Sequence, residues 1–190
     1  MARPVHVDPQ EAVAKAMDLF WEHGYQSVSV DEIVQSTGLN RHTLYNKYGS
    51  KFGLLTAALT EYRTRVLDRI EQLLDEPGTC RERIQNLLRV REPHGGQGVW
   101  DQMLTQGCFA IRVTAELRDS HQELADELDA FGGRIEELVA EVVRQGQETG
   151  EFRRDRTAED LASVLVSGFL VPLIYTPATP RTDAFLAVLD

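Results

Sequence analysis

Hydrophobic positions in the first fifty residues recur with the period of short amphipathic helices. Over residues 9–23 they return every third or fourth position, which predicts a helix with one buried face. Asp8 is suited to cap the start of this helix, and Gly24 is suited to end it. Ser29 and Glu32 have the spacing of a capping box, which predicts that a second, shorter helix begins there.

A third helix is predicted over residues 40–48, after a break at Gly38. Gly38 permits a sharp turn, and Leu44 gives the third helix a buried anchor. Ser50 is suited to cap a fourth helix that begins at Lys51. A helix, a short helix, a glycine turn and another short helix within about forty residues are typical of the helix-turn-helix arrangement.

The remaining residues keep the helical period to the end of the chain. Helices are expected at about 54–76, 80–90, 99–118, 121–147 and 158–175. The alternation of hydrophobic and polar residues that is typical of β-strands does not occur in the sequence. The sequence therefore predicts an all-α fold, with a three-helix helix-turn-helix head over residues 1–55 and a helical body over residues 56–190.

The composition is that of an ordinary water-soluble chain, with 42% hydrophobic and 26% charged residues. Two cysteines are too few for a disulfide framework, which favours a reducing compartment. The first residues contain no apolar run suited to a signal peptide. The longest apolar stretch, at 161–175, is interrupted and is shorter than the ~20 residues of a membrane-spanning helix. We therefore expect a cytoplasmic protein that does not enter a membrane.

The net charge of −10 argues at first against a nucleic-acid partner, but the charge is unevenly divided. Residues 1–55 carry five basic and six acidic side chains, whereas residues 56–190 carry fifteen basic and twenty-four acidic ones. Residues 41–51 contain three basic side chains and no acidic one. Because phosphates respond to the local face presented to them, an acidic body with a locally basic head is compatible with DNA binding.

The third predicted helix turns a polar face outward. Its polar residues are Arg41, His42, Thr43, Tyr45, Asn46 and Lys47. In a helix-turn-helix, the N-terminal part of this helix reads base edges in the major groove. Tyr45 and Lys51 offer a hydroxyl and an ammonium to phosphates, and the helix starts near Ser29 and Ser50 also favour anions. The alternative is a small helical subdomain with a solvated polar face.

The region from Gly24 to Lys51 resembles the DNA-binding domain of the tetracycline-repressor (TetR) family. The matching residues are Gly24-Tyr25, Ser29-Val30-Asp31-Glu32-Ile33-Val34 and Thr37-Gly38-Leu39-Asn40-Arg41-His42-Thr43-Leu44-Tyr45-Asn46-Lys47-Tyr48-Gly49-Ser50-Lys51. The resemblance implies that the major groove is contacted by Arg41, His42, Thr43 and Asn46. It also implies phosphate contacts by Tyr45, Lys47 and Lys51, and by Ser29 at the start of the second helix. Tyr48 matches a mostly structural aromatic residue.

One departure from the family pattern lies directly after Lys51. Many relatives carry an acidic residue at this point, whereas this chain has Phe52-Gly53. The fourth helix is therefore expected to be less well capped and its first turn looser.

The two late helices allow two arrangements. They can pack inside one chain, or each can pair with its two-fold mate in a four-helix interface. The resemblance favours a homodimer, because the late helices of TetR-like proteins form the dimer and an operator has two half-sites. The interface is then expected to contain Leu124, Leu128, Phe131, Ile135, Leu138, Val142, Leu161, Val164, Leu165, Gly168 and Val171.

The resemblance also implies a cavity in the body for a small, largely apolar effector. The residues expected to line it are Tyr62, Val66, Trp100, Met103, Leu104, Phe109, Val113, Phe131 and Phe169. Any one of these residues taken alone is better explained as part of an ordinary hydrophobic core, and it is the family resemblance that suggests a pocket for the group.

Cys108 follows Gly107 in a Gly-Cys step that resembles a subset of these regulators, some of which respond to electrophiles or oxidants. A helix start after Gly107, or nearby Arg112, would favour the thiolate and make Cys108 a redox-sensing residue. The alternative is a small buried side chain.

Neither a metal, a cofactor nor catalysis is expected. The five histidines form no pair with metal-ligand spacing, and the sequence contains no Cys-x-x-Cys pair and no nucleophile elbow. The sequence therefore predicts a ligand-responsive homodimeric transcriptional regulator, most simply a repressor, that binds palindromic double-stranded DNA. The alternative from another class is a small-molecule or electrophile sensor, acting through Cys108, whose DNA binding is weak or lost. A purely structural dimerisation module would leave the polar face of the third helix without a role.

Overall fold

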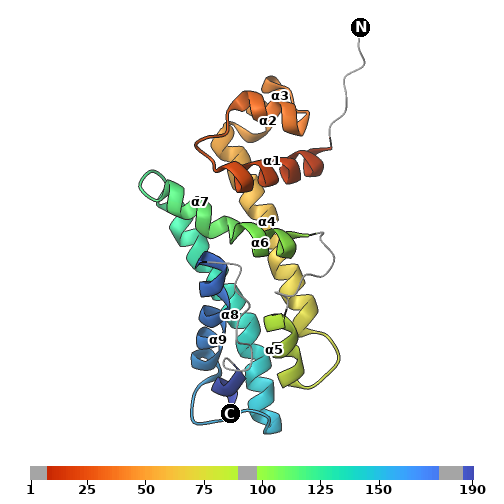
Figure 1. Cartoon of the computed structure of the whole chain (residues 1–190), viewed down its shortest axis with the longest axis vertical. Coiled ribbons are helices and arrows are strands. Elements are labelled where there is room, and N and C mark those ends of the chain that lie inside the picture. The colour runs from red at the N-terminus through yellow and green to blue at the C-terminus, as the bar shows by residue number, and fades with distance from the viewer. Residues whose placement is uncertain (1–7, 90–97, 176–185) are drawn as a thin grey trace.

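Helices form most of the described structure, a computed structural model that covers residues 8–89, 98–175 and 186–190. The side chains of residues 89, 104 and 169–175 lie outside the description. Within these ranges the chain contains α-helices, one short 3₁₀-helix and no strand, which confirms the all-α prediction. Figure 1 shows a helical head at one end of an elongated body.

The head consists of α1 (Pro9–His23), α2 (Val30–Thr37) and α3 (Arg41–Tyr48). Helices α1 and α3 pack on α4 (Lys51–Leu74), and α2 packs on α1. A side chain caps the N-terminus of each of these four helices. Asn40 Oδ1 accepts from the Thr43 amide at 2.7 Å, and Ser29 and Glu32 form the reciprocal capping box that their spacing predicts. Gly38 takes the left-handed conformation, with φ 74° and ψ 1°, between α2 and α3. These local signals explain why the head folds as predicted.

The body contains α5 (Cys80–Arg89), α6 (Val99–Gln106), α7 (Phe109–Leu117), α8 (Glu123–Thr149), α9 (Ala158–Tyr175) and the 3₁₀-helix Ala187–Leu189. The long α8 lies beside α9 and also packs on α4, α5 and α7. Helix α4 runs from the head into the body, across the predicted boundary at residue 55, and α7 crosses beneath the head (Figure 1). The described helices include none that combines the length and hydropathy needed to cross a membrane.

The predicted helix at 99–118 is two helices, because the chain breaks at Gly107. Gly107 has φ 80° and ψ −177°, a conformation that L side chains rarely adopt, and Cys108 is the N-cap residue of α7. The hydrophobic period continues across the break, so periodicity alone does not reveal it. The break redirects the chain, so that α6 lies against α4 while α7 extends toward α8.

The first turn of α4 is not left uncapped by the missing acidic residue. The Ser50 hydroxyl accepts from the Gly53 amide at 3.0 Å, as the sequence around Ser50 predicts. Gly53 is required for a close approach, because a Cβ there would overlap the carbonyl oxygen of Tyr48. The ring of Phe52 lies 3.7 Å from that of His121, with an interplanar angle of 10°. Gly53 therefore lets α4 approach the end of α3 closely, and Phe52 packs the start of α4 against the body.

The predicted dimer interface includes residues that the structure places in the core of a single chain. The side chains concerned are Leu124, Phe131, Ile135, Val142, Leu161 and Leu165. The physical reason is that α8 is flanked within one chain by α4, α5, α7 and α9, so its hydrophobic stripe is already covered. Leu128, Leu138 and Gly168 are partly buried, Val164 is 49% exposed, and the side chain of Val171 lies outside the described residues.

Candidate DNA-binding face and internal cavity

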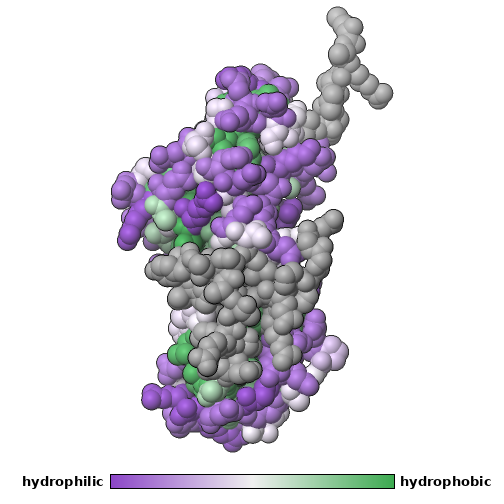
Figure 2. All heavy atoms as spheres, viewed as in Figure 1, coloured by the Kyte–Doolittle hydropathy of each residue, from purple (hydrophilic) through white to green (hydrophobic). Residues whose placement is uncertain are grey.

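Helix α3 presents the polar face that the sequence predicts. Leu44 is fully buried beneath it, and Thr43 is half-buried. The other polar residues of this helix are exposed, namely Arg41, His42, Tyr45, Asn46 and Lys47. Tyr45 is 47% exposed, more than any other large aromatic side chain that the structure describes. Figure 2 shows a mostly hydrophilic surface over the head. This face is free of acidic residues along α3 itself, so it can approach a polyanion.

Two contacts organise the side chains of this face. The Arg41 guanidinium donates from Nη2 to Asp31 Oδ1 at 2.6 Å, which joins the first turns of α3 and α2. The Asn46 amide lies 3.2 Å from a ring nitrogen of His42, one turn earlier on α3. The face therefore has organised side chains before any partner binds.

Ser29 and Lys51, which were predicted to hold phosphates, both make contacts within the head. The Ser29 hydroxyl donates to Glu32 Oε2 at 2.7 Å, and hydrogen bonds from Ser29 lower the pKa of the Glu32 carboxyl. The Lys51 ammonium donates to the carbonyl of Val28 and lies 4.4 Å from the centre of the Tyr25 ring. Burial lowers the pKa of Lys51. Both side chains thus fix the turn before α2, and a phosphate would have to share them.

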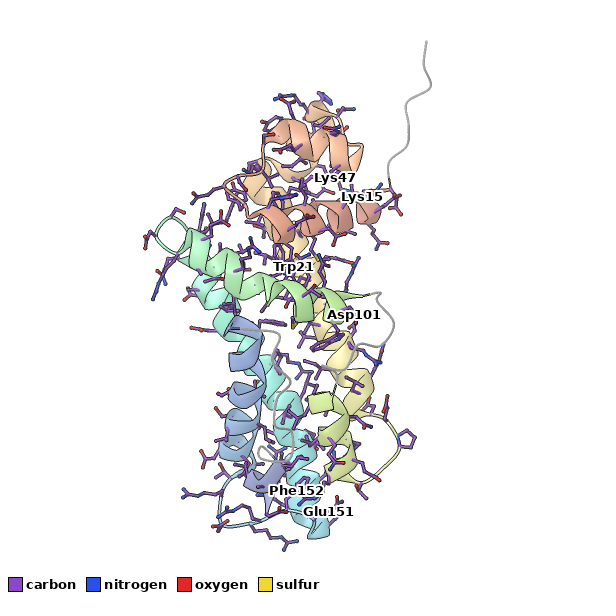
Figure 3. The ribbon with its side chains drawn as sticks, viewed as in Figure 1. Lys15, Trp21, Lys47, Asp101, Glu151 and Phe152 are labelled. Atoms are coloured by element: carbon purple, nitrogen blue, oxygen red, sulfur yellow. The ribbon has the colours of Figure 1, made fainter. Side chains whose placement is uncertain are left out.

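Helix α7 joins the head to the body through contacts that the sequence does not signal. Glu116 accepts hydrogen bonds from the amides of Tyr25 and Gln26 at 2.9 and 2.6 Å, in the turn after α1. The Trp21 indole donates to the carbonyl of Gly107 at 3.0 Å. Figure 3 shows Trp21 on the side of α1 that faces the body. The partners are about ninety residues apart in sequence, so no local pattern points to them.

Glu116→Ala is expected to loosen this junction. Two backbone donors lose their acceptor, so the free energy of unfolding should fall by about 1–3 kcal/mol. The amides of Tyr25 and Gln26 should also exchange with solvent faster, which hydrogen exchange followed by NMR measures. Asp119→Ala, just beyond the same helix, is the matched control. Unchanged exchange at both amides in the Glu116 variant would contradict the assigned contact.

An apolar cavity lies in the body between α4, α5, α6, α8 and α9. It encloses about 30 Å³, room for roughly one water molecule. The lining residues are Tyr62, Val66, Ile70, Ile84, Leu87, Leu88, Trp100, Met103, Cys108, Phe131, Ile135, Val139, Leu165 and Val166.

Five predicted pocket residues therefore line this cavity, namely Tyr62, Val66, Trp100, Met103 and Phe131. Two others lie elsewhere in the core: Val113 is buried, and Phe109 packs against Trp21 and Tyr62. The side chains of Leu104 and Phe169 lie outside the described residues. The contribution of α5 was missed, as were Leu165 and Val166 of α9, because periodicity shows that a residue is buried but not which neighbours surround it.

Cys108 stands in the wall of the cavity. Its Sγ lies 3.2 Å from the hydroxyl of Tyr62, and both residues are buried. Burial raises the pKa of the Cys108 thiol, and this effect outweighs the hydrogen bonds at the start of α7 that lower it. Cys108, Phe131 and Ile135 also line an outer groove along α8, so they separate this groove from the cavity. The predicted helix start is present at Cys108, but burial of the thiol favours its neutral form.

Metal-binding groups are not assembled in the part of the chain that the structure describes. No cluster of three or more His, Cys, Asp or Glu side chains there could hold an ion. The described geometry thus consists of a polar face on α3, an apolar cavity in the body and the α7 junction between them.

Two family models match separate parts of the chain. Residues 12–58 match the model described as bacterial regulatory proteins of the tetR family, and residues 95–179 match the model of the tetracyclin repressor-like C-terminal domain. The first covers most of α1, all of α2 and α3 and the start of α4, and the second covers α6–α9.

Curated relatives agree with these matches. The HTH-type transcriptional repressor ComR of Escherichia coli is 29% identical over 79% of this chain and 70% of its own length. An uncharacterised HTH-type regulator of Bacillus subtilis, YezE, is 23% identical over 83% of this chain and 79% of its own length. The repressor BdcR of E. coli is 40% identical over only 32% of this chain and 30% of its own, a stretch of 60 residues.

Solved structures share the whole fold. A cysteine variant of the TetR-family regulator CifR, in complex with 26-bp operator DNA, matches with a TM-score of 0.72 and 25% identity over 98% of this chain and 96% of that one. The reduced form of E. coli NemR matches with a TM-score of 0.74 and 17% identity over 95% and 94%. The head, the body and the matches to both family models lead to one conclusion: the chain is a transcriptional regulator that belongs to the TetR family.

Proposed function

We propose that this regulator is a homodimeric, ligand-responsive repressor that inserts α3 of each head into the major groove of a palindromic operator. The observation that carries this proposal is the exposed, acid-free polar face of α3 above a buried Leu44. The proposed groove-facing residues are Arg41, His42, Thr43 and Asn46, and the proposed phosphate-facing residues are Ser29, Tyr45, Lys47 and Lys51. The operator complex of CifR supports this use of the fold. Because the proposed partner is operator DNA, we place the protein in the cytoplasm, and the proposed role requires no catalytic activity.

The proposed dimer uses the outward faces of α8 and α9. Leu138 and Gly168 are only partly buried in one chain, and Val164 is 49% exposed. Covering an exposed valine with a second copy is favourable, and a two-fold axis there would present two heads to one duplex. Successive major-groove half-sites are ~34 Å apart, so the separation of the heads decides whether both bind.

The proposed effector is a small apolar molecule that enlarges the cavity. At about 30 Å³ the cavity has no room for such a molecule, so binding must move its walls. One wall residue, Cys108, follows Gly107, whose carbonyl holds Trp21 of the head. A movement of Cys108 would therefore also move the neighbouring carbonyl of Gly107, which is hydrogen-bonded to Trp21 of α1.

A mobility-shift assay across a salt series tests the proposed function. The purified protein is mixed with the DNA that flanks its own gene and, separately, with an unrelated duplex of equal length. We expect selective binding that weakens steeply with salt, and size-exclusion chromatography with light scattering should give the mass of a dimer. Equal affinity for both duplexes at every salt concentration would contradict operator recognition.

The alternative, a sensor that acts through a reactive Cys108, makes a different prediction. Because burial raises the pKa of Cys108 and Cys80 is also buried, both thiols should react with iodoacetamide much more slowly in the native protein at pH 8 than after unfolding. Mass spectrometry of timed samples measures this difference. A fast-reacting thiol that persists in Cys80→Ala and disappears in Cys108→Ala would instead establish the sensor.

A further inference from the structure

A carboxylate lies beside the polar face of α3, where a DNA-binding surface would be expected to avoid one. Asp31 is in the first turn of α2, and its side chain is 77% exposed. Its Oδ1 accepts from Nη2 of Arg41 at 2.6 Å. Arg41 is the first residue of α3 and its side chain is 57% exposed. The pair therefore bridges the two helices of the helix-turn-helix on their outer side.

Stability alone does not account for this pair. Exposed ion pairs contribute little to folding, because water screens both charges and two long side chains must be ordered. The start of α2 is already capped by Ser29 and Glu32. For DNA binding the negative charge of Asp31 is unfavourable, because an uncompensated carboxylate repels phosphates. Its contact with Arg41 therefore needs an explanation in recognition.

The geometry of the guanidinium supplies one. Arginine has five N–H donors arranged in a fixed plane, and Asp31 accepts from only one of them, on Nη2. Donors that remain can pair bidentately with O6 and N7 of a guanine in the major groove. A guanidinium that is fixed before binding loses less conformational freedom on contact and tolerates fewer alternative bases. Asp31 also cancels the charge that Arg41 would otherwise offer to any phosphate.

We propose that Asp31 is a specificity-determining residue that positions Arg41 toward a guanine of the operator and suppresses binding to unrelated DNA. The inference rests on the proposed function, because it requires that α3 reads base edges. Asp31 itself touches no base: it acts through Arg41, and its effect is on the ratio of specific to non-specific affinity.

Asp31→Asn is the decisive variant, because it keeps the shape of the side chain and removes its charge. We expect operator affinity to fall about tenfold while affinity for the unrelated duplex rises about threefold. The dependence of non-specific binding on salt should steepen by up to about two counterions per dimer, one for each released Arg41. Both duplexes are titrated by fluorescence anisotropy over the same salt series. Thermal denaturation verifies that the variant is folded.

Three further variants separate positioning from charge. Glu61→Gln removes one negative charge from an ion pair on α4, where Arg65 Nε lies 2.8 Å from Glu61 Oε1, and should leave the specificity ratio unchanged. Arg41→Lys keeps the charge but lacks the planar fork, so it should lose operator affinity without a gain on unrelated DNA. Asp31→Asn added to Arg41→Ala should have no further effect on specificity, because the two residues act as a unit.

The outcomes distinguish the inference from the function on which it rests. Wild-type protein that does not discriminate between the duplexes overturns the proposed function. Selective wild-type binding, with Asp31→Asn raising affinity for both duplexes by the same factor, overturns the inference alone and reduces Asp31 to a repelling charge. A fall on the operator with a rise on the unrelated duplex, absent from Glu61→Gln, supports the assigned role.

Discussion

Gly53→Ala is expected to lower the free energy of unfolding by roughly 3 kcal/mol, a large effect for the addition of one methyl group. Gly53 lies in the first turn of α4, and a Cβ there would overlap the carbonyl oxygen of Tyr48. A backbone oxygen cannot move aside as the end of a long side chain can, so α3 and α4 must separate. Overpacking that shifts backbone typically costs about 1–3 kcal/mol, and here it also strains the cap from Ser50.

Chemical denaturation followed by circular dichroism measures this effect. Thr56→Ala is the control, because it changes one side chain in the same helix, one turn later, and should stay within about 0.5 kcal/mol of wild type. Since the displaced element is α3, operator binding by Gly53→Ala should fall even where the protein remains folded. If Gly53→Ala gave the same denaturation curve as the wild-type protein, α3 and α4 would not approach each other as closely as described.

Lys47→Glu is expected to weaken operator binding by roughly 100-fold at physiological salt, with little change in stability. Lys47 is exposed on α3, and its ammonium lies 5.6 Å from the centre of the Tyr48 ring. The reversal removes the phosphate contact proposed for Lys47 in each head and places a repelling charge there. The slope of log affinity against log salt should therefore become shallower by about two per dimer.

Arg65→Glu is the matched control for this charge reversal. Arg65 lies on α4 and is paired with Glu61 at 2.8 Å. It is about 21 Å along the helix from Lys51, more than two Debye lengths at physiological salt. Its operator affinity and salt slope should stay close to those of wild type. Equal losses in both variants would mean that binding follows the total charge of the protein and not a phosphate contact at Lys47.

The head could be predicted almost completely from the sequence because its determinants are local. Ser29, Asn40 and Ser50 cap helices within three residues of themselves, and Gly38 makes the turn between α2 and α3. Leu44 is the buried member of a short helix whose other side chains are mostly polar. Each of these signals is readable over a few positions and is fixed before distant elements pack.

The body was predicted less completely because its determinants are distant in sequence. The stripe on α8 correctly indicates burial, but it does not show that helices of the same chain already cover Phe131 and Ile135. The break at Gly107 is hidden within a continuous hydrophobic period. Glu116 looks like any surface carboxylate until the turn after α1 is placed beside it. Periodicity reports that a face is buried, whereas the identity of the neighbours depends on tertiary packing.

The contact between Trp21 and Gly107 has a consequence for the evolution of this regulator. The residue that anchors the head precedes one that lines the cavity, so under the proposed function ligand preference and repression strength would share a segment of chain. Substitutions at the α6–α7 break that adapt the cavity to a new compound will also shift the resting position of the heads. New ligand responses should therefore arise together with altered basal expression, and compensating changes are to be expected in α1.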